Sequence, residues 1–581
     1  MILVKSLITL YLLSFLSGCQ KVNEDWSSYG KNLENQRYSK LRQINEENVK
    51  DLKLDWQYQT GIKATFQATP IVYQGVMYIS LPYNHVLAIN AKTGKEIWRY
   101  EHERNPEWKM CCGPSNRGLA LHGEQLFMGT VDARLISLNI KTGKKIWDID
   151  VVSNLVTTES ISSLNDIDPN RKKIVSGGTG VGISMAPVIY QNKVIIGITG
   201  VGYGLHIENT KKEAPLGSVV GVAGSFGRPG FLAAYDIYSG KQIWQFDTIP
   251  EKGWEGEMSN YTRDGEVLNR DLFIEKESLE KFPNAAQFGG GSAWTTPAID
   301  AETHTLFFGT GNPSPQMSGE SRPGDNLYTV SLVALDANTG KLKWFYQQVP
   351  HDIWGYDVAS PPVLFHTIKN GKVIPVVGQA GKTGWFYIHD RNTGELILKS
   401  DAFVPQQNMF TEATKEGTVI YPGILGGSNW SPVSLDIDEH IAYISGIHAP
   451  IKYTLHEKIS SNNVTHYTSS EPTEDQQWGL LSAINLSNGK IVWQYQTDQP
   501  LLGGTLATNG KLVFSGEGNG NLNAFHSLTG RLLWTTKIDA GVNAPPITYM
   551  IDGKQYIAVA AGGNKIMGYK QGDFISVYSL H

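Results

Sequence analysis

The stretch AINAKTGKEIW, residues 88–98, decides the fold: a strand, a Thr-Gly turn, and a second strand that carries a tryptophan. Residues 137–147, SLNIKTGKKIW, repeat this pattern, and further copies end at Trp244, Trp344, Trp493 and Trp534. Glycine permits the backbone conformation of a tight turn, and a large indole can pack against a neighbouring unit. Such a repeat predicts small β-sheets that bury their faces only by stacking on one another.

Two weaker copies bring the repeat to eight strand ends. Residues 389–394 keep the turn but are followed by Leu398 instead of a tryptophan, and residues 51–56 form a lone outer strand that ends at Trp56. We therefore predict an all-β fold, an eight-bladed β-propeller with tryptophan-docking repeats, as one domain over residues 19–581. The lone strand near Trp56 is expected to complete the last blade, whose inner strands follow residue 540, and so to close the ring.

Composition and spacing add two expectations. The net charge is -5 and charged residues make up only 18%, which argues against a nucleic-acid-binding surface. Long insertions interrupt the repeat at about 154–180, 205–230, 250–290 and 400–425, and we expect them to wall a pocket on one face of the ring. The polar residues 462–475 are predicted to form an exposed loop.

The N-terminus has the pattern of an export signal. Lys5 precedes an apolar run over residues 7–16 that is too short to span a bilayer, and the run ends in Leu16-Ser17-Gly18-Cys19. This resembles a bacterial lipobox, which predicts a signal peptide over residues 1–18 and a lipid on Cys19. Gln20 after the cysteine favours the outer membrane, facing the periplasm. The alternative is an ordinary cleaved signal peptide.

The two remaining cysteines, Cys111 and Cys112, are adjacent in the chain. If they join, they close a small strained ring, which is a rigid and polarisable surface. An exported protein meets an oxidising compartment, in which such a bond persists. With the amide of Asn116 and the cation of Arg117 behind it, the pair is suited to a flat, anionic, redox-active ligand. The alternative is two free cysteines in a loop.

Three motifs identify a family resemblance. They are CCGPSNRG at residues 111–118, GTGNPSP at 309–315 and RPGDNLYT at 322–329. Together with the repeat, they resemble the alcohol and sugar dehydrogenases that depend on pyrroloquinoline quinone (PQQ). The resemblance covers nearly all of the mature chain. It implies a propeller with PQQ on its axis, between a disulfide formed by Cys111 and Cys112 and the ring of Trp294.

The same resemblance implies the other residues of a PQQ site. Arg117 is expected to pair with a carboxylate or carbonyl of the cofactor, and Ser184 and Thr199 to donate from their hydroxyls. Lys382 matches the lysine of the sugar and polyol members, where alcohol members have arginine. The remaining implied contacts to PQQ are Gln67, Asn429 and Trp430.

The expected metal site departs from the family pattern. The resemblance implies Ca²⁺ or a lanthanide held by a Glu, an Asn and an Asp, and only the Asn is present, as Asn312. Gly202 stands in place of the Glu, and Gly355 in place of the catalytic Asp. Asp357, two residues further on, is predicted to replace the lost group as base or ligand, since residues two apart in a strand point to the same side. Glu208 is a further candidate carboxylate.

These features predict an enzyme that oxidises an alcohol, polyol or sugar hydroxyl in the periplasm, by hydride transfer to PQQ. The chain has no CxxCH haem motif, so its electrons are expected to pass to a separate acceptor, a cytochrome c or a quinone. The substrate is expected to be a small-molecule or polymeric alcohol or sugar, and Leu502, where alcohol members have tryptophan, suggests a more open pocket that suits a larger or polymeric one. The alternatives are a non-catalytic propeller lipoprotein that acts as an outer-membrane scaffold, or a degenerate PQQ-binding protein.

Overall fold

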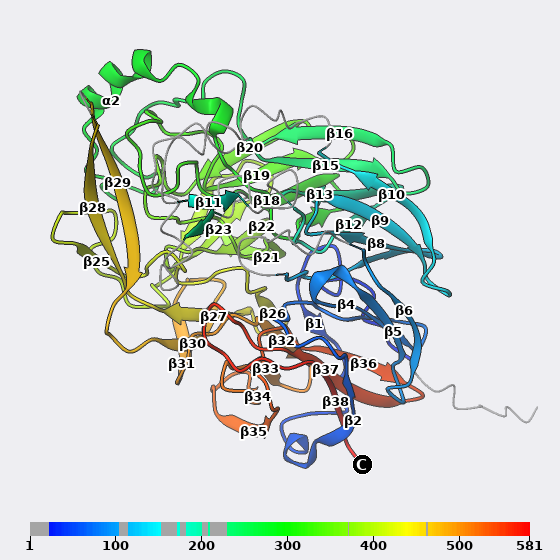
Figure 1. The fold of residues 1–581 in the computed structure, drawn as a ribbon. Coiled ribbons are helices and arrows are strands. Elements are labelled where there is room, and N and C mark those ends of the chain that lie inside the picture. Colours follow the sequence, from blue (N-terminus) through cyan, green and yellow to red (C-terminus); the bar gives the residue numbers. More distant parts are fainter. Residues whose placement is uncertain are drawn as a thin grey trace, which may run out of the picture.

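The chain folds almost entirely into antiparallel β-sheets (Figure 1). The computed structural model describes residues 23–103, 114–152, 171–174, 182–199, 207–209, 229–369, 371–460 and 463–581. Cys19, Cys111, Cys112 and Gly202 lie outside these ranges. Among the described residues, no helix has the length and apolar character needed to cross a membrane.

Eight sheets of at least four strands follow one another along the described chain. Sheet 1 contains β3 (Ile71–Tyr73), β4 (Val76–Ser80), β5 (Val86–Asn90) and β6 (Glu96–Tyr100), and sheet 2 contains β7 (Ala120–His122), β8 (Gln125–Gly129), β9 (Arg134–Asn139) and β10 (Lys145–Asp150). Sheet 3 contains β12 (Val188–Tyr190), β13 (Lys193–Gly197), β15 (Phe231–Asp236) and β16 (Gln242–Asp247), and sheet 4 contains β17 (Ala298–Asp300), β18 (Thr305–Gly309), β19 (Ser331–Asp336) and β20 (Leu342–Gln347).

Sheets 5 to 8 complete the series. Sheet 5 contains β21 (Val363–Lys369), β22 (Lys372–Ala380), β23 (Phe386–Asp390) and β24 (Leu396–Lys399), and sheet 6 contains β26 (Ser434–Asp436), β27 (Ile441–His448), β30 (Trp478–Asn485) and β31 (Ile491–Thr497). Sheet 7 contains β32 (Thr505–Thr508), β33 (Leu512–Gly516), β34 (Asn521–His526) and β35 (Leu532–Lys537), extended by β1 (Tyr38–Ser39) in parallel pairing. Sheet 8 contains β36 (Ile547–Ile551), β37 (Lys554–Ala561), β38 (Phe574–Ser579) and β2 (Lys53–Gln59).

Sheet 8 joins the two ends of the chain. Strand β2 pairs antiparallel with β38, and Trp56 lies opposite Val577. The prediction that the lone strand near Trp56 completes the last sheet is therefore confirmed. The outer strand of the sheet built from β36, β37 and β38 therefore comes from the N-terminal part of the chain.

Each repeat tryptophan contacts the following sheet through its indole. In all of them except Trp534, the ring packs on the turn glycine of that sheet: a Cβ on Gly94 would lie 2.7 Å from the Trp56 ring, and one on Gly143 would lie 2.4 Å from the Trp98 ring. Its Nε1–H donates to a backbone carbonyl there: Trp56 to Ala91, Trp98 to Ile140, Trp147 to Ile237, Trp244 to Ala337, Trp344 to Arg391, Trp493 to Ser527 and Trp534 to Leu52. These contacts run from sheet 8 to sheet 1 and onward, so the sheets follow one another in a circle.

The N-terminal segment over residues 24–39 is mostly irregular and forms hydrogen bonds with several of the sheets. Its backbone pairs with Val72, Ile299, Leu364, Leu435, Ala507 and Met550, which belong to six different sheets. Within it, Arg37 is fully buried and donates to the carbonyls of Tyr29, Thr505 and Pro546. Burial lowers the pKa of Arg37 to about 10. The sequence repeat gives no hint of this crossing, because residues 24–39 have no periodicity of their own.

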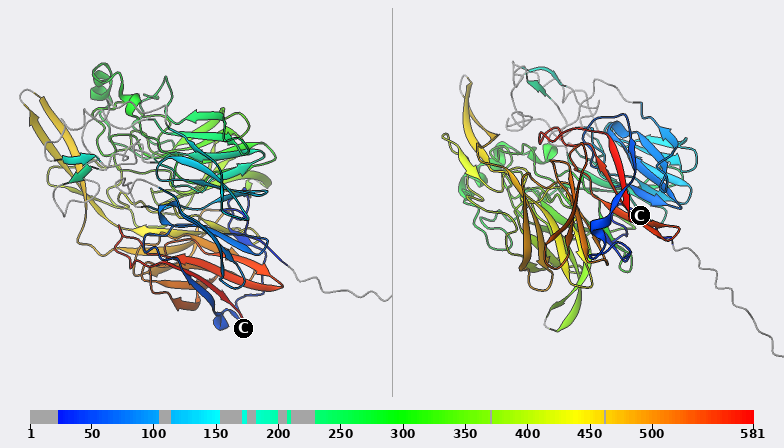
Figure 2. Two further views of the ribbon diagram at one scale, coloured as in Figure 1. Left: turned by 45° about the vertical axis from the view of Figure 1, so that its right-hand side comes forward. Right: turned by 90° about the horizontal axis from the view of Figure 1, so that it is seen from below.

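Two insertions form structure beyond the ring. Residues 463–472 form β29 (Asn463–Pro472), which pairs with β28 (Ile451–Ser460), and β25 (Thr418–Ile420) from another insertion adds a third strand. The prediction of an exposed loop over 462–475 is therefore wrong for β29, whose valine, threonine and tyrosine residues favour a strand once a partner is present. Figures 1 and 2 show this hairpin projecting from the other sheets.

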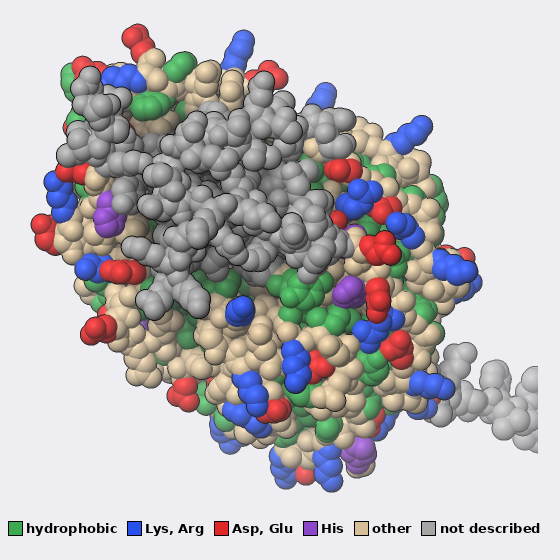
Figure 3. Space-filling model, in the orientation of Figure 1, with side chains coloured by type: hydrophobic (Ala, Val, Ile, Leu, Met, Phe, Trp, Pro, Cys, Tyr) green, Lys and Arg blue, Asp and Glu red, His purple; other side chains and the backbone are tan. Residues whose placement is uncertain are grey.

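The remaining short elements lie in turns and insertions. Helix α2 (Leu272–Ser278) lies in the 250–290 insertion and begins after Asp271, whose side chain accepts from the N–H groups of Phe273 and Ile274. The 3₁₀ turns are η1 (Val49–Asp51), η2 (Pro82–Asn84), η4 (Leu279–Lys281) and η5 (Ala285–Phe288), and β11 (Arg171–Ile174) pairs with β14 (Ile207–Asn209). Acidic and basic side chains are interspersed over the described part of the face in Figure 3.

The docking contact can be tested with two glycines of sheet 2. Gly143 and Gly123 both have positive φ, but a Cβ on Gly123 meets nothing within 4 Å. We expect Gly123→Ala to cost about 1–2 kcal/mol of unfolding free energy from backbone strain alone. Gly143→Ala should cost about 1–3 kcal/mol more, because its methyl overlaps the Trp98 ring. Urea unfolding of both variants measures the difference, and equal costs would contradict a role for the indole contact.

Candidate active site

The GTGNPSP motif lies between two other segments at the centre of the site. After β18, the N–H of Gly311 donates to Ser292 O at 2.8 Å, and Asn312 O accepts from Gly291 at 3.0 Å. On its other side, Val358 N donates to Thr310 O at 3.1 Å. The glycines are needed for this approach, since a Cβ on Gly309 would lie 2.0 Å from Val358 O. The motif thus joins the segment that leads to Trp294 to the one that carries Asp357.

Asp357 is buried and accepts hydrogen bonds on both carboxylate oxygens. Its Oδ1 accepts from the backbone N–H of Asn312, and its Oδ2 accepts from Lys382 Nζ at 3.1 Å. The same ammonium donates to Gly355 O at 2.8 Å. Only 7% of Asp357 and 5% of Lys382 is exposed, so this ion pair is shielded from water. Sequence analysis predicted both residues for the site, and the structure brings them into direct contact.

The position of Lys382 is fixed by a glycine-rich loop. Gly427 N donates to Lys382 O at 2.6 Å, and a Cβ on Gly426 would lie 2.3 Å from Lys382 Cγ. The loop continues to Asn429, whose side-chain amide donates to Leu425 O and accepts from the N–H of Trp430. Asn429 therefore shapes its own turn, and this turn places the buried ring of Trp430.

Arg117 completes a closed series of contacts around the site. Its Nη1 donates to Ser184 Oγ at 2.8 Å and to Trp294 O at 3.2 Å. Its guanidinium carbon lies 4.9 Å from the centre of the Trp294 ring and 5.2 Å from that of Trp430. Such cation–π contacts fix the cation between two aromatic walls. Contacts therefore run from Arg117 through Trp294, the GTGNPSP motif, Asp357, Lys382 and Trp430 back to Arg117.

Other predicted residues lie apart from these contacts. Gln67 is buried, and its Oε1 has no hydrogen-bond partner in the described structure. Thr199 is half-buried and pairs with Gly182 through its backbone. Sequence analysis missed Asn543, which is 1% exposed and whose amide oxygen and nitrogen both have no partner among the described residues. Unpaired buried amides of this kind fit a bound polar ligand, because such groups are costly to leave unpaired.

A repeat signal could have revealed Asn543. Gln67, Ser184, Trp294 and Asn543 each lie three residues before a proline that directly precedes the first strand of a sheet, namely β3, β12, β17 and β36. Equivalent positions of different sheets thus supply the residues of the site. Cys111 and Cys112, predicted to form the opposite wall, are outside the described residues.

The expected metal ligands do not form an oxygen-rich cluster. Asn312 directs its Nδ2 to Pro313 O, and Asp357 is already paired with Lys382. The described part of the chain contains no group of three or more His, Cys, Asp and Glu side chains placed to hold a metal ion. Gly355 has a φ of +84°, and a Cβ there would lie 2.4 Å from Gln316 Nε2. Since Ca²⁺ takes six to eight oxygen ligands, these residues fit a hard cation poorly.

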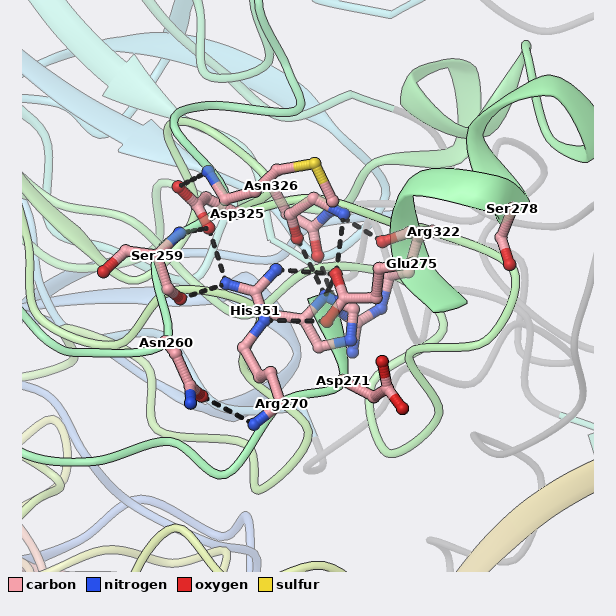
Figure 4. A network of polar contacts seen from close by, with 12 residues as sticks. Ser259, Asn260, Arg270, Asp271, Glu275, Ser278, Arg322, Asp325, Asn326 and His351 are labelled. Atoms are coloured by element: carbon pink, nitrogen blue, oxygen red, sulfur yellow. Dashed lines mark hydrogen bonds and ion pairs between the residues drawn. The ribbon is translucent and has the colours of Figure 1, made fainter. Parts of the chain in front are cut away.

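The RPGDNLYT motif contributes to a buried polar network next to the candidate site (Figure 4). Arg322 is fully buried and donates to Pro315 O, to Asn326 Oδ1 and, at 2.6 Å, to Asp352 O. In the same network Arg270 pairs with Glu275 and with Asp325. The motif therefore links the 250–290 insertion to the segment that ends at Asp357.

Asp352 holds the turn that precedes Asp357. Its carboxylate accepts from the N–H groups of Trp354, Gly355 and Tyr356 at 3.1–3.2 Å. Burial raises the pKa of Asp352 to about 6, although the N–H groups of Tyr356 and Trp354 and the charge of Arg322 oppose this shift. The turn directs Gly355 O toward Lys382, which makes Asp352 a positioning residue that sequence analysis overlooked.

Comparisons with known proteins identify the family of this chain. A sequence profile of the PQQ-type glucose/ethanol/alcohol dehydrogenase β-propeller domain matches residues 26–409 and 400–557. The chain belongs to this PQQ-dependent alcohol dehydrogenase family. It is 32% identical over 575 residues to quinohemoprotein alcohol dehydrogenase of Comamonas testosteroni, covering 94% of this chain and 73% of that protein. The quinoprotein alcohol dehydrogenase PedH of Pseudomonas putida is 31% identical, covering 92% and 85%.

Solved structures of quinoproteins share the fold. The Comamonas testosteroni enzyme superposes with a TM-score of 0.77 at 30% identity, over 96% of this chain and 80% of that one. A europium-containing methanol dehydrogenase superposes with a TM-score of 0.76 at 24% identity, over 96% and 98%. The predicted membership among PQQ-dependent dehydrogenases, a family of oxidoreductases, is therefore confirmed, as is the β-propeller domain.

The raised pKa of Asp352 predicts a dependence of stability on pH. The folded state keeps this proton up to a pH of about 6, whereas an unfolded aspartate releases it near pH 4, so the folded state binds more protons between these values. The contribution of Asp352 to the unfolding free energy should therefore fall as the pH rises from about 4 to about 6, and stay level above. Thermal unfolding of the wild type and Asp352→Asn across this range measures it. An unchanging difference between the two proteins would contradict the shift.

Proposed function

We propose that this protein oxidises the hydroxyl-bearing carbon of an alcohol, polyol or sugar with PQQ as its cofactor. The observation that carries the proposal is that Arg117 contacts Trp294 and Trp430, while Asp357 pairs with Lys382, and that the GTGNPSP motif and the glycine-rich loop join these two groups, in a chain of this family. This arrangement presents aromatic walls, two cations and one carboxylate around a common centre. These groups suit a flat, conjugated ligand that carries carboxylates.

The residues that would hold PQQ act through stacking and charge. Trp294 would supply one stacking face, and Cys111 and Cys112, joined as a disulfide, the other. Arg117 and Lys382 would pair with acidic or carbonyl oxygens, while Gln67, Ser184, Thr199, Asn429 and Trp430 would line the edge, as would Asn543. When bound, PQQ supplies an acceptor for the hydride that leaves the substrate carbon.

Asp357 is proposed as the base that takes the hydroxyl proton. Its Oδ2 lies in a buried site and faces the Lys382 ammonium, and its Oδ1 is held by the N–H of Asn312. These two contacts fix the carboxylate in one orientation, which general-base catalysis requires. Asp352 and Arg322 hold the preceding turn in place through hydrogen bonds, so the proposed base lies on a fixed segment of the chain.

The wider setting is proposed from the sequence. Residues 1–18 would be a signal peptide, and a lipid on Cys19 would anchor residues 19–581 at the periplasmic side of the outer membrane. The eight sheets would act as eight blades of this single domain, held by the tryptophan contacts. A separate cytochrome c or quinone would accept the electrons. Lys382 favours the polyol and sugar branch, and the small Leu502 beside Trp430 favours a larger or polymeric substrate.

The role of Asp357 can be tested by an isosteric substitution. Asp357→Asn keeps the hydrogen bond from Asn312 but cannot take a proton, so turnover should fall at least about 100-fold. Dye reduction with a panel of alcohols, polyols and aldoses measures turnover, and tryptophan quenching by PQQ measures binding. PQQ should still bind to the variant.

Asp55→Asn is the matched control, because Asp55 is also a partly buried carboxylate paired with a lysine, Lys554, but lies in sheet 8 away from the site. It should leave turnover unchanged. Full activity in Asp357→Asn would exclude Asp357 as the base. Binding of PQQ by the wild type without turnover of any substrate would favour the degenerate PQQ-binding protein, and no binding at all would favour the scaffold.

A further inference from the structure

We propose that PQQ binding to this protein does not depend on a metal ion, because the ammonium of Lys382 takes the place of the cation. The inference rests on the proposed function, since it concerns the same cofactor. It also replaces our expectation of Ca²⁺ or a lanthanide held by Asn312 and Asp357. Four features of the described residues support it.

The first feature is that both oxygens of Asp357 already have a hydrogen-bond partner. Its Oδ2 is paired with Lys382 at 3.1 Å and its Oδ1 with the N–H of Asn312. Each oxygen keeps a lone pair that can accept a proton, but a metal ion bound there would share the carboxylate with both partners. It would also stand beside a buried ammonium, where two positive charges repel strongly because little water screens them.

The second feature is that Lys382 has little freedom to move away. Gly426 and Gly427 pack directly on its main chain and on the start of its side chain, and Gly427 N is bonded to Lys382 O. At its other end the ammonium is bonded to Gly355 O at 2.8 Å as well as to Asp357. The lysine is therefore anchored at both ends, and its charge is a fixed part of the site.

The third feature is the loss of two carboxylates without described replacements. Gly355 and Gly202 carry no side-chain oxygen in any conformation. At Gly355 the positive φ and the close Gln316 and Ile424 side chains leave no room for a larger residue without rearrangement. Asn312 keeps its amide nitrogen on Pro313 O. An amide and one paired carboxylate make a weak site for a cation that prefers many oxygen ligands.

The fourth feature is the fixed positive charge of the site. PQQ carries three carboxylates, and Arg117 and Lys382 offer two cations without any ion, although Lys382 is shared with Asp357. Arg117 is held between two indoles and bonded to Ser184, so its charge is as fixed as that of Lys382. A preorganised pair of cations can bind an anionic cofactor because little side-chain freedom is lost on binding.

The test is a binding titration that does not require turnover. The purified full-length protein is stripped of metal and titrated with PQQ by calorimetry and tryptophan quenching, in EDTA, in Ca²⁺ and in La³⁺. We expect the dissociation constants in the three buffers to agree within about threefold. Lys382→Met should weaken binding in EDTA at least tenfold, and Lys382→Arg, which retains the positive charge, should restore most of it. Lys554→Met, which breaks the remote pair with Asp55, is the matched control and should bind PQQ normally.

Each result decides between the two proposals. Binding that appears only with Ca²⁺ or La³⁺ would overturn the metal-free site and leave the proposed function intact. Normal binding by Lys382→Met in EDTA would also overturn it. No binding in any buffer would remove both proposals. If Lys382→Met fails to fold because Asp357 loses its partner, the double variant Lys382→Met with Asp357→Asn removes both charges, and the comparison of buffers on the wild type stands without either variant.

Discussion

The structure depends on a circular chain of indole–glycine contacts. Each repeat tryptophan donates to a carbonyl of the next sheet, and all except Trp534 also lie on its turn glycine; Trp534 closes the circle by donating to Leu52, beside β2. Sheet 5 has Leu398 in this position, which lies close to Gly489 but has no N–H to donate. The circle tolerates this weaker contact because the sheets on both sides are fixed independently by the remaining ones.

The candidate active site depends on that circle. Its residues lie just before the first strands of different sheets, and the arrangement of the sheets brings them together. Arg117 precedes sheet 2, Trp294 precedes sheet 4, Asp357 precedes sheet 5 and Trp430 precedes sheet 6. The contacts among these residues therefore depend on how the four sheets are placed relative to one another. The buried network of Arg322 and Asp352 adds local precision to the segment where the charge pair lies.

The sequence predicted the parts of the molecule that repeat or that carry rare motifs. The spacing of tryptophan and glycine indicated the sheets and the pairing of the first and last segments, and the family resemblance assigned Arg117, Trp294, Asp357 and Lys382 to one site. Features without a period were missed: the crossing segment 24–39, the polar strand β29, and Asp352, which in sequence resembles any aspartate in a turn. The contact between Lys382 and Asp357 was also out of reach, because their side-chain directions depend on how two loops of sheet 5 pack.

The pairing of β2 with β38 has a consequence for biosynthesis. Strand β38 is synthesised long after β2, so sheet 8 cannot form until β38 has left the ribosome. Until then, the edge of β2 that pairs with β38 is open to solvent, and unpaired edges invite wrong association. A chain that lacks β38 would leave β2 without its partner in sheet 8. Loss of β38 is therefore expected to be as damaging to this protein as a lesion in its centre.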